Sequence, residues 1–422
     1  MPTVRKQRIG ERRTAALAVI GRAAPIPARG LRRLARSGRL RRVAVVGSAR
    51  TASALEGEIE LDPSIRSRVV GRIPPDHETE AEPEVPVLGP EVPVLGELSG
   101  LRHVVRLHRI DLVVISGEAS RVRVFDEALP AAERWFRVCE LSDFYEAVFG
   151  HVPTAEINAS WFHYLVHPAY REPAIAKRAV DIVAGVLLAL ILLPLIAALT
   201  LLIRLDGGPA LFRQGRIGER GRPITIYKLR TMRASDSNPP RWSSARDPRV
   251  TPVGRFLRRT HLDEAPQILN VLRGEMSLVG PRPEQPEFVR RLEESLPFYQ
   301  RRHLIKPGIT GWAQIRCGYA GSDVGSAWKL CHDLYYMKYR SLRLDLLILA
   351  RTLEHILVPR AFEFHPSRPS AALIAAAAMP SPPVVVAASR STGILSPHVG
   401  GERRQERRFH RGLQPTGLRR GR

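Results

Sequence analysis

The chain is 422 residues long, enough for two or three domains, and its 44% hydrophobic content excludes a wholly disordered protein. Its formal net charge of +24 resembles that of nucleic-acid-binding proteins. The charge lies in the tails, however, because residues 1–42 hold 13 Lys/Arg against one acid and residues 360–422 hold 11 against three. Neither tail has zinc-finger spacing or aromatic RNA-binding strands, so we expect no nucleic-acid partner and favour attraction to anionic membrane lipids.

Two segments are predicted to be disordered: the basic segment 1–40 and the Ala/Pro/Ser/Val-rich and arginine-rich tail 360–422. The three cysteines, Cys139, Cys317 and Cys331, are widely spaced and form no CxxC pair. This spacing argues against a disulfide framework and against a zinc site, and it fits a reducing cytoplasm.

Residues 41–155 are predicted to form a small Rossmann-like domain of the α/β class. RRVAVVGSARTASAL (41–55) is typical of a strand followed by a helix, and DLVVI (111–115) of a second buried strand. A dinucleotide fingerprint needs three glycines beside the phosphates, but only Gly47 is present and alanines fill the other two positions, which argues against NAD. The heptad PEVPVLG, repeated in tandem between these strands, predicts an extended loop.

A linker at 156–176 is predicted to lead into a membrane helix at 177–206. From Ile182 to Ile203, 22 residues carry no charge. As a helix they would extend about 33 Å, which is enough to cross a hydrocarbon core of about 30 Å.

The sequence leaves two geometries open for this helix. Pro194, near its middle, removes a backbone hydrogen bond and predicts a kink. Basic residues flank both ends, Lys177 and Arg178 before and Arg204 after, so the positive-inside rule gives no orientation. A re-entrant helix that bends at Pro194 and returns to the face it entered satisfies both observations. The alternative is a spanning helix with a tolerated proline.

Residues 207–359 are predicted to form a mixed α/β catalytic domain. Its most informative stretch is RTHLDEAPQILNVLRGEMSLVGPRP (259–283), which places two adjacent carboxylates, Asp263 and Glu264, in a basic chain. Helix capping would explain Asp263 through the helix dipole, but it gives Glu264 no role.

A helix is predicted to begin at this pair. With Thr260 as N-cap, Pro266 would fall in the second turn and clash, whereas Asp263 as N-cap leaves the proline in the first turn. Gly274 is the predicted end. The predicted apolar face consists of Ile268, Leu269 and Leu272.

The functional interpretation of the pair is a phosphate site. A helix N-terminus favours anions, one carboxylate can bind Mg²⁺, and its neighbour can attack phosphorus. Positive groups must neutralise the phosphoryl oxygens, and the candidates are Arg213, Lys228, Arg230, Arg258 and Arg282. Pro281 and Pro283 stiffen the backbone around Arg282, which lowers the entropy lost when its guanidinium binds a ligand.

From Lys177 to about Thr352 the sequence resembles the bacterial sugar transferases of the monotopic phosphoglycosyl transferase superfamily. The motifs occur in order: KRAVDI, LFRQ, KLRTM, LDEAPQILNVLRGEMSLVGPRP, KPGITGWAQ and LDLLILARTL. So many ordered motifs are a far more specific signal than one glycine-rich loop. The upstream segment, ending in LSDFYEAVFGHVP (141–153), is similar to the non-catalytic nucleotide-binding-like domain of long members.

This resemblance implies an enzyme of exopolysaccharide or O-antigen biosynthesis on the cytoplasmic face of the bacterial inner membrane, held by a re-entrant helix. Asp263 would attack the β-phosphorus of a UDP-sugar and release UMP, and undecaprenyl phosphate would then accept the sugar phosphate. Glu264 would carry Mg²⁺, Arg282 would contact the nucleotide, and Lys228 and Arg230 would contact the phosphates. The resemblance favours UDP-glucose or UDP-galactose, leaves N-acetylated hexoses open, and suggests a homodimer.

Two alternatives and two departures accompany the resemblance. A catalytically idle membrane scaffold of the same fold is one alternative, against which the intact Asp263–Glu264 pair argues. A soluble nucleotide-binding protein with a buried apolar helix is the other, and it would stay soluble in high salt without detergent.

Long members carry transmembrane helices before the α/β segment, whereas none is predicted within 1–40, so we expect a shortened form or a start further upstream. His261 stands where relatives often have a small hydroxyl residue, and we expect it to be solvated or packed.

Overall fold

The computed structural model describes residues 28–36, 38–74, 90–117, 124, 136–154, 157, 161–162, 174–205, 207–233, 249–317 and 322–357. The predicted tail 360–422, most of the segment 1–40, most of the linker 156–176 and the first PEVPVLG heptad lie outside these residues.

The N-terminal part is built on a four-stranded parallel sheet in the order β2-β1-β3-β4. The strands are β1 (Arg41–Val46), β2 (Ser67–Ile73), β3 (Leu112–Ile115) and β4 (Arg137–Glu140). The two strands predicted from the sequence, β1 and β3, are the central ones and pair with each other, Val43 opposite Leu112. Their continuous apolar runs suit this position, because both faces of a parallel sheet are buried.

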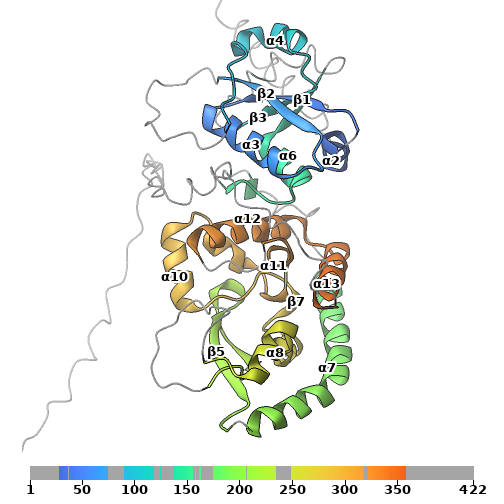
Figure 1. Ribbon diagram of the computed structural model, residues 1–422, viewed down its shortest axis with the longest axis vertical. Coiled ribbons are helices and arrows are strands. Elements are labelled where there is room, and N and C mark those ends of the chain that lie inside the picture. The colour runs from blue at the N-terminus through green and yellow to red at the C-terminus, as the bar shows by residue number, and fades with distance from the viewer. Residues whose placement is uncertain are drawn as a thin grey trace, which may run out of the picture. The chain divides into compact units, whose positions relative to one another are not determined.

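Helices cover both faces of this sheet (Figure 1). Val43 and Val45 of β1 face one core cluster, and Ala44 and Val46 face the other, as strand geometry requires. The first cluster is completed by α2 (Ala28–Arg36), α3 (Ala49–Leu61) and α6 (Leu141–Val148). The second is completed by η1 (Leu98–Gly100) and α4 (Leu101–Leu107). The predicted α/β class is confirmed, and the narrower Rossmann-like assignment stays a prediction.

Helix α2 lies inside the segment 1–40, so the prediction of disorder is wrong for Ala28–Arg36. Leu31 and Ala35 lie one helical turn apart on the same face, and both are buried in the cluster that α6 completes. The arginines around this short apolar stripe dominate the composition, which is why an argument from charge does not detect it.

One long helix, α7 (Ala174–Leu205), covers the predicted membrane segment. Among the residues that the structure describes, it is the one helix long and apolar enough to cross a membrane. Pro194 lies inside it, and Figure 1 shows α7, in green, bending along its length.

The part of the chain after α7 is mixed α/β, as predicted. It contains an antiparallel hairpin of β5 (Leu211–Ile217) and β6 (Pro223–Leu229), joined at η5 (Glu219–Gly221), and a short parallel pair of β7 (Ser277–Val279) and β8 (Gly308–Thr310). The helices are α8 (Pro252–Thr260), η6 (Leu262–Gln267), α9 (Ile268–Arg273), α10 (Pro286–Ser295), η7 (Tyr299–Leu304), α11 (Trp312–Cys317), α12 (Asp323–Tyr339) and α13 (Leu342–Leu357).

The start of α7 is attached to this part of the chain. The two terminal nitrogens of Arg178 donate to the carbonyls of Val271, over 2.6 Å, and Leu272, over 2.8 Å. These carbonyls belong to the last turn of α9, where a cation also complements the helix dipole. Lys177 Nζ forms an ion pair with Asp345 of α13 over 2.5 Å.

The end of α7 is attached to the same part. Leu199 and Ile203 are buried in a cluster with Leu229 of β6 and Leu257 of α8. Arg230 Nη2 donates to the carbonyl of Ile203 over 3.0 Å. Both ends of α7 therefore contact the part of the chain that follows it, whereas Leu187, Leu190 and Leu193 in its middle are exposed.

Candidate active site

The Asp263–Glu264 pair lies on η6, between α8 and α9. Helix α8 ends at Thr260 and is capped by His261, whose φ of 56° is in the left-handed region, and η6 begins at Leu262. The predicted helix start at Asp263 is therefore wrong, because α9 begins only at Ile268. Pro266, which has no N–H to donate, lies within the 3₁₀ turns.

The predicted end of this helix is confirmed, but its predicted apolar face is only partly correct. Gly274 has a φ of 82° and caps α9. Ile268 and Val271, three residues apart, share the buried face, whereas Leu269 is 48% exposed and Leu272 is half-buried. Leu269 is rotated by about 100° from Ile268, which turns it towards the outside.

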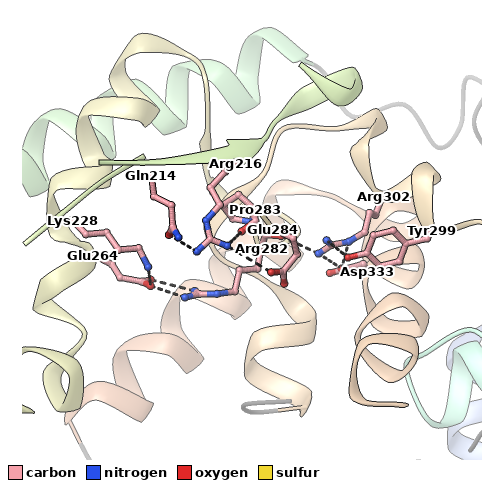
Figure 2. A network of polar contacts seen from close by, with 10 residues as sticks. All are labelled: Gln214, Arg216, Lys228, Glu264, Arg282, Pro283, Glu284, Tyr299, Arg302 and Asp333. Atoms are coloured by element: carbon pink, nitrogen blue, oxygen red, sulfur yellow. Dashed lines mark hydrogen bonds and ion pairs between the residues drawn. The ribbon is translucent and has the colours of Figure 1, made fainter. Parts of the chain in front are cut away.

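Glu264 is buried and held by two cations (Figure 2). Lys228 Nζ donates to Glu264 Oε1 over 2.8 Å. Arg282 donates from Nη2 to Oε1 over 2.6 Å and from Nη1 to Oε2 over 3.3 Å. Burial acts to raise the pKa of Glu264, but the charges and hydrogen bonds of Arg282 and Lys228 prevail and hold it well below its ordinary value.

Asp263 is half-buried, and its carboxylate has no hydrogen bond or ion pair within the described parts of the chain. Burial and the charge of Glu264 raise the pKa of Asp263, against the opposing effect of Lys228, His261 and Arg258. A carboxylate with free lone pairs beside cationic groups has the properties of a nucleophile for an anionic substrate.

Arg282 is presented by a loop that follows β7 and requires close backbone packing. A Cβ on Gly280 would lie 2.4 Å from the carbonyl oxygen of Lys306, and a Cβ on Gly308 would lie 2.1 Å from the nitrogen of Gly280. Only glycine fits at these two positions. The crossing of the two backbones fixes the start of the Pro281–Pro283 turn.

Not all of the predicted cations gather at the carboxylates. Lys228 and Arg282 bind Glu264, and Arg258 acts on Asp263 through its charge. Arg230 instead binds the end of α7, and Arg213 is exposed on β5, with its guanidinium 5.9 Å from a tyrosine ring. The predicted phosphate contacts of these two residues stay predictions.

The sequence analysis did not identify the other residues of the network in Figure 2, which are Gln214, Arg216, Glu284, Tyr299, Arg302 and Asp333. Arg216 Nη2 donates to Gln214 Oε1 over 2.7 Å, and Arg216 pairs with Glu284 over 3.7 Å. The spacing of Gln214 and Arg216 on one face of β5 is a signal that could have found them. Arg302 and Asp333 form a buried pair at 2.8 Å, and no local pattern links two residues so far apart in the chain.

A small polar pocket lies where these side chains meet. It is lined by Arg216, Ile226, Lys228, Glu264, Gln267, Arg282 and Pro283. Its lining carries the three cations Arg216, Lys228 and Arg282 against one carboxylate, Glu264, and Figure 2 shows these side chains in the network. The excess of positive charge favours an anion such as a diphosphate.

The donor set fits the predicted Mg²⁺ only together with a substrate. Within the described ranges no three His, Cys, Asp or Glu side chains gather as a metal site. Asp263 has no partner in the part of the chain that the structure describes, and Glu264 accepts three N–H groups of the roughly four that a carboxylate can take. Mg²⁺ is commonly held by one or two carboxylates plus substrate phosphates and water, which matches this pair.

Comparison with known proteins identifies the same region. Residues 172–359 match the family described as bacterial sugar transferase. A UDP-N-acetylgalactosamine-undecaprenyl-phosphate N-acetylgalactosaminephosphotransferase of Aeromonas hydrophila is 44% identical over 186 residues, which are 44% of this chain and 44% of that protein. An undecaprenyl-phosphate glucose phosphotransferase of Komagataeibacter xylinus is 45% identical over 194 residues, 44% of this chain and 36% of the relative.

These two relatives are matched over less than half of their length. A shorter relative, exopolysaccharide production protein PSS of Rhizobium leguminosarum bv. phaseoli, is 39% identical over 186 residues, which are 42% of this chain and 93% of that protein. The matched region begins just before α7 and ends just after α13, so it includes α7 and every residue of the network in Figure 2. The chain therefore belongs to the bacterial sugar transferase family.

Proposed function

We propose that the protein is an initiating phosphoglycosyl transferase, which moves a hexose 1-phosphate from a UDP-sugar to undecaprenyl phosphate in exopolysaccharide or O-antigen biosynthesis. The observation that carries the proposal is the contrast at η6: among the described residues Asp263 has no hydrogen bond or ion pair, while Glu264 is fixed by Lys228 and Arg282. The two relatives from Aeromonas hydrophila and Komagataeibacter xylinus are named as undecaprenyl-phosphate phosphotransferases, which supports the acceptor.

The proposed reaction has two displacements at one phosphorus. In the first, a carboxylate oxygen of Asp263 attacks the β-phosphorus of the UDP-sugar, the bond from that phosphorus to the bridging oxygen breaks, and UMP leaves. In the second, an oxygen of undecaprenyl phosphate attacks the phosphosugar-aspartate, which releases the carboxylate and gives undecaprenyl diphosphate sugar. A covalent intermediate divides one difficult displacement into two easier ones.

The neighbouring side chains have distinct roles in this scheme. Arg282 and Lys228 neutralise charge on the phosphoryl oxygens, and their existing contacts with Glu264 place them before the substrate arrives. Glu264 and the donor phosphates would hold Mg²⁺, which would neutralise further phosphate charge when bound. Lys228, His261 and Arg258 act through their charges to lower the pKa of Asp263, against burial and Glu264, which raise it.

The sugar is proposed from resemblance, with UDP-glucose or UDP-galactose favoured. The relatives include both a glucose and an N-acetylgalactosamine phosphotransferase. A panel of UDP-glucose, UDP-galactose and the two N-acetylated donors decides between them.

The proposed location is the cytoplasmic face of the bacterial inner membrane, with α7 re-entrant. Support comes from the attachment of both ends of α7 to the catalytic part, through Arg178 at the start and Ile203 at the end. A spanning helix would separate these two contacts by the thickness of the bilayer. UDP-sugars are made in the cytoplasm, so the catalytic part must lie on that side.

The test incubates the purified protein with each radiolabelled UDP-sugar, Mg²⁺ and undecaprenyl phosphate, and follows label extracted into butanol. We expect labelled lipid from the wild type and none from Asp263→Asn, with Asp323→Asn, an exposed site, as the matched control. Without the acceptor, one UMP should be released per active site, and the label should remain on the protein. Lipid product without a protein-bound phosphosugar, or substantial turnover by Asp263→Asn, would exclude the covalent mechanism. Failure of every donor with the wild type would favour the idle scaffold.

A further inference from the structure

The loop that carries Arg282 is bound at four successive main-chain carbonyls. At its start, the carbonyl of Pro281 accepts from the nitrogen of Gly308 over 2.9 Å. At its end, the carbonyl of Glu284 accepts from the nitrogen of Ile217 over 3.0 Å. These two contacts tie the loop to β8 and β5.

Arginine side chains bind the two carbonyls in between. Arg302 Nη2 donates to the carbonyl of Arg282 over 3.0 Å, and Arg216 Nη1 donates to the carbonyl of Pro283 over 3.1 Å. Because every carbonyl from 281 to 284 is bound, the direction in which the Arg282 side chain leaves the backbone is set before any substrate binds.

Arg302 is itself fixed in place. Its side chain is 3% exposed, and both Nε and Nη2 bind Oδ2 of Asp333, over 2.9 and 2.8 Å, while the Asp333 side chain is 2% exposed. Its remaining terminal nitrogen, Nη1, donates to the hydroxyl of Tyr299 over 3.2 Å. A single guanidinium thus joins α12, η7 and the Arg282 loop.

Stability alone does not account for such a pair. Taking two charges out of water is so unfavourable that well-packed apolar residues of similar volume often serve a fold as well or better. What apolar residues lack is a donor for the carbonyl of Arg282. Figure 2 shows Arg302 and Asp333 on the opposite side of this loop from Glu264, so neither reaches the pocket directly.

From this arrangement we propose that Arg302 and Asp333 are a positioning pair, which fixes the main chain at Arg282 and thereby aims its guanidinium at Glu264 and the donor diphosphate. The inference rests on the proposed function, since the donor step is the reaction in which Arg282 acts. Because Arg302 and Asp333 act only by placing Arg282, substituting them should change the rate of the donor step only while the Arg282 guanidinium is present.

The test is a double-mutant cycle read by UMP release in a single turnover, with the UDP-sugar that the donor panel selects. Arg302→Lys keeps the positive charge but loses the planar fork that binds carbonyl and carboxylate together. We expect it to slow UMP release at least about tenfold in the wild type and by less than about twofold when Arg282→Met is already present. Arg301→Lys, the same change at the exposed neighbouring position, should leave the rate unchanged.

A second variant guards against simple unfolding. Arg302→Met with Asp333→Leu removes both charges together, so no unpaired charge stays buried. We expect this protein to keep a cooperative thermal transition and to show the same loss in UMP release. An equal loss from Arg302→Lys in both backgrounds would overturn the proposal, as would full activity of the folded double variant. A wild type that releases no UMP from any donor would instead overturn the proposed function, so the two failures are distinguishable.

Discussion

Asp263 and Glu264 are adjacent on η6, and their carboxyl pKa values are displaced in opposite directions. Burial and the charge of Glu264 raise the pKa of Asp263, whereas Arg282 and Lys228 outweigh burial and lower the pKa of Glu264. Neighbouring carboxyl groups whose pKa values differ in this way can have two different roles. Glu264 stays ionised as a fixed anchor, and Asp263 is the group whose protonation changes with pH.

The pH dependence of the first step should follow Asp263. A protonated carboxyl cannot attack phosphorus, so UMP release should be lost as the pH falls through the raised pKa of Asp263. Arg258 acts to lower this pKa, so Arg258→Met should move the acid limb of the rate profile to higher pH. Arg255→Met, an exposed change on the same helix, is the control. An acid limb that stays in place or moves to lower pH in Arg258→Met contradicts the assignment.

Asp263→Asn should abolish turnover and yet stabilise the fold at neutral pH. A carboxyl whose folded pKa lies above its unfolded value weakens the fold once it is ionised, and this penalty is absent at pH values below both. The neutral amide escapes the penalty, so we expect a gain in the free energy of unfolding of about 1 kcal/mol at pH 7. Denaturant titrations at pH 7 and at pH 3 measure it. A gain of equal size at both pH values would point to a cause other than ionisation.

Glu264→Gln should have the opposite effect on stability. The lowered pKa of Glu264 means that its contribution is present above its ordinary value of 4.5 and is lost as the pH falls below it. The amide leaves Lys228 and Arg282 without their partner. We expect a loss of about 2 kcal/mol at pH 7, less than for a fully buried pair, because the Arg282 side chain is 34% exposed. Thermal unfolding followed by circular dichroism in detergent measures this, and an unchanged midpoint contradicts it.

The sequence predicted those parts of the molecule in which neighbouring residues decide the structure. The apolar runs of β1 and β3, the uncharged span of α7 and the glycine that ends α9 are all local patterns, and the structure confirms them. Lys228 and Arg282 were also among the predicted cations, because the KLRTM motif and the flanking prolines mark them in the sequence.

Other features depend on contacts that no local pattern records. The η6 helix begins directly after the left-handed backbone of His261, which the sequence does not predict, since a positive φ is uncommon for any residue other than glycine. The Arg302–Asp333 pair joins residues 31 positions apart, so neither charge is distinguishable from an ordinary surface charge until the chain is folded. Arg230 was assigned to the phosphates together with Lys228, two residues before it in the same motif. Strand geometry would place two such residues on one face, but β6 ends at Leu229, and Arg230 binds the carbonyl of Ile203 instead.

Mg²⁺ should bind well only when the donor or its product is present. The described residues offer two adjacent carboxylates and no third ligand from His, Cys, Asp or Glu, so substrate phosphates must complete the coordination. We expect the affinity for Mg²⁺ to rise at least about tenfold when UMP is added, as measured by calorimetry, and to lose this gain in Glu264→Gln. Glu354→Gln, an exposed change, is the control. Tight binding of Mg²⁺ to the protein alone would contradict the shared site.

Pro194→Leu should change how α7 meets the membrane. Leucine restores the N–H donor and removes the ring that clashes with the preceding turn, so the helix can straighten. A straight helix of 32 residues is about 48 Å long and would carry Ile203 away from its contact with Arg230. Because Arg230 directly follows β6, which carries Lys228, we expect UMP release to fall with the loss of this contact.

Labelling in sealed membrane vesicles tests the change of path. Cysteines placed at the exposed positions Ile175 and Leu205 should both react with an impermeant maleimide from the cytoplasmic side in the wild type. In Pro194→Leu, the cysteine at 205 should become protected from that side, whereas Leu195→Ala, which keeps the proline, should label as the wild type does. If both positions of Pro194→Leu still label from the cytoplasmic side at full activity, the bend does not depend on the proline. If the two wild-type positions label from opposite sides, α7 spans the bilayer and the re-entrant path is wrong.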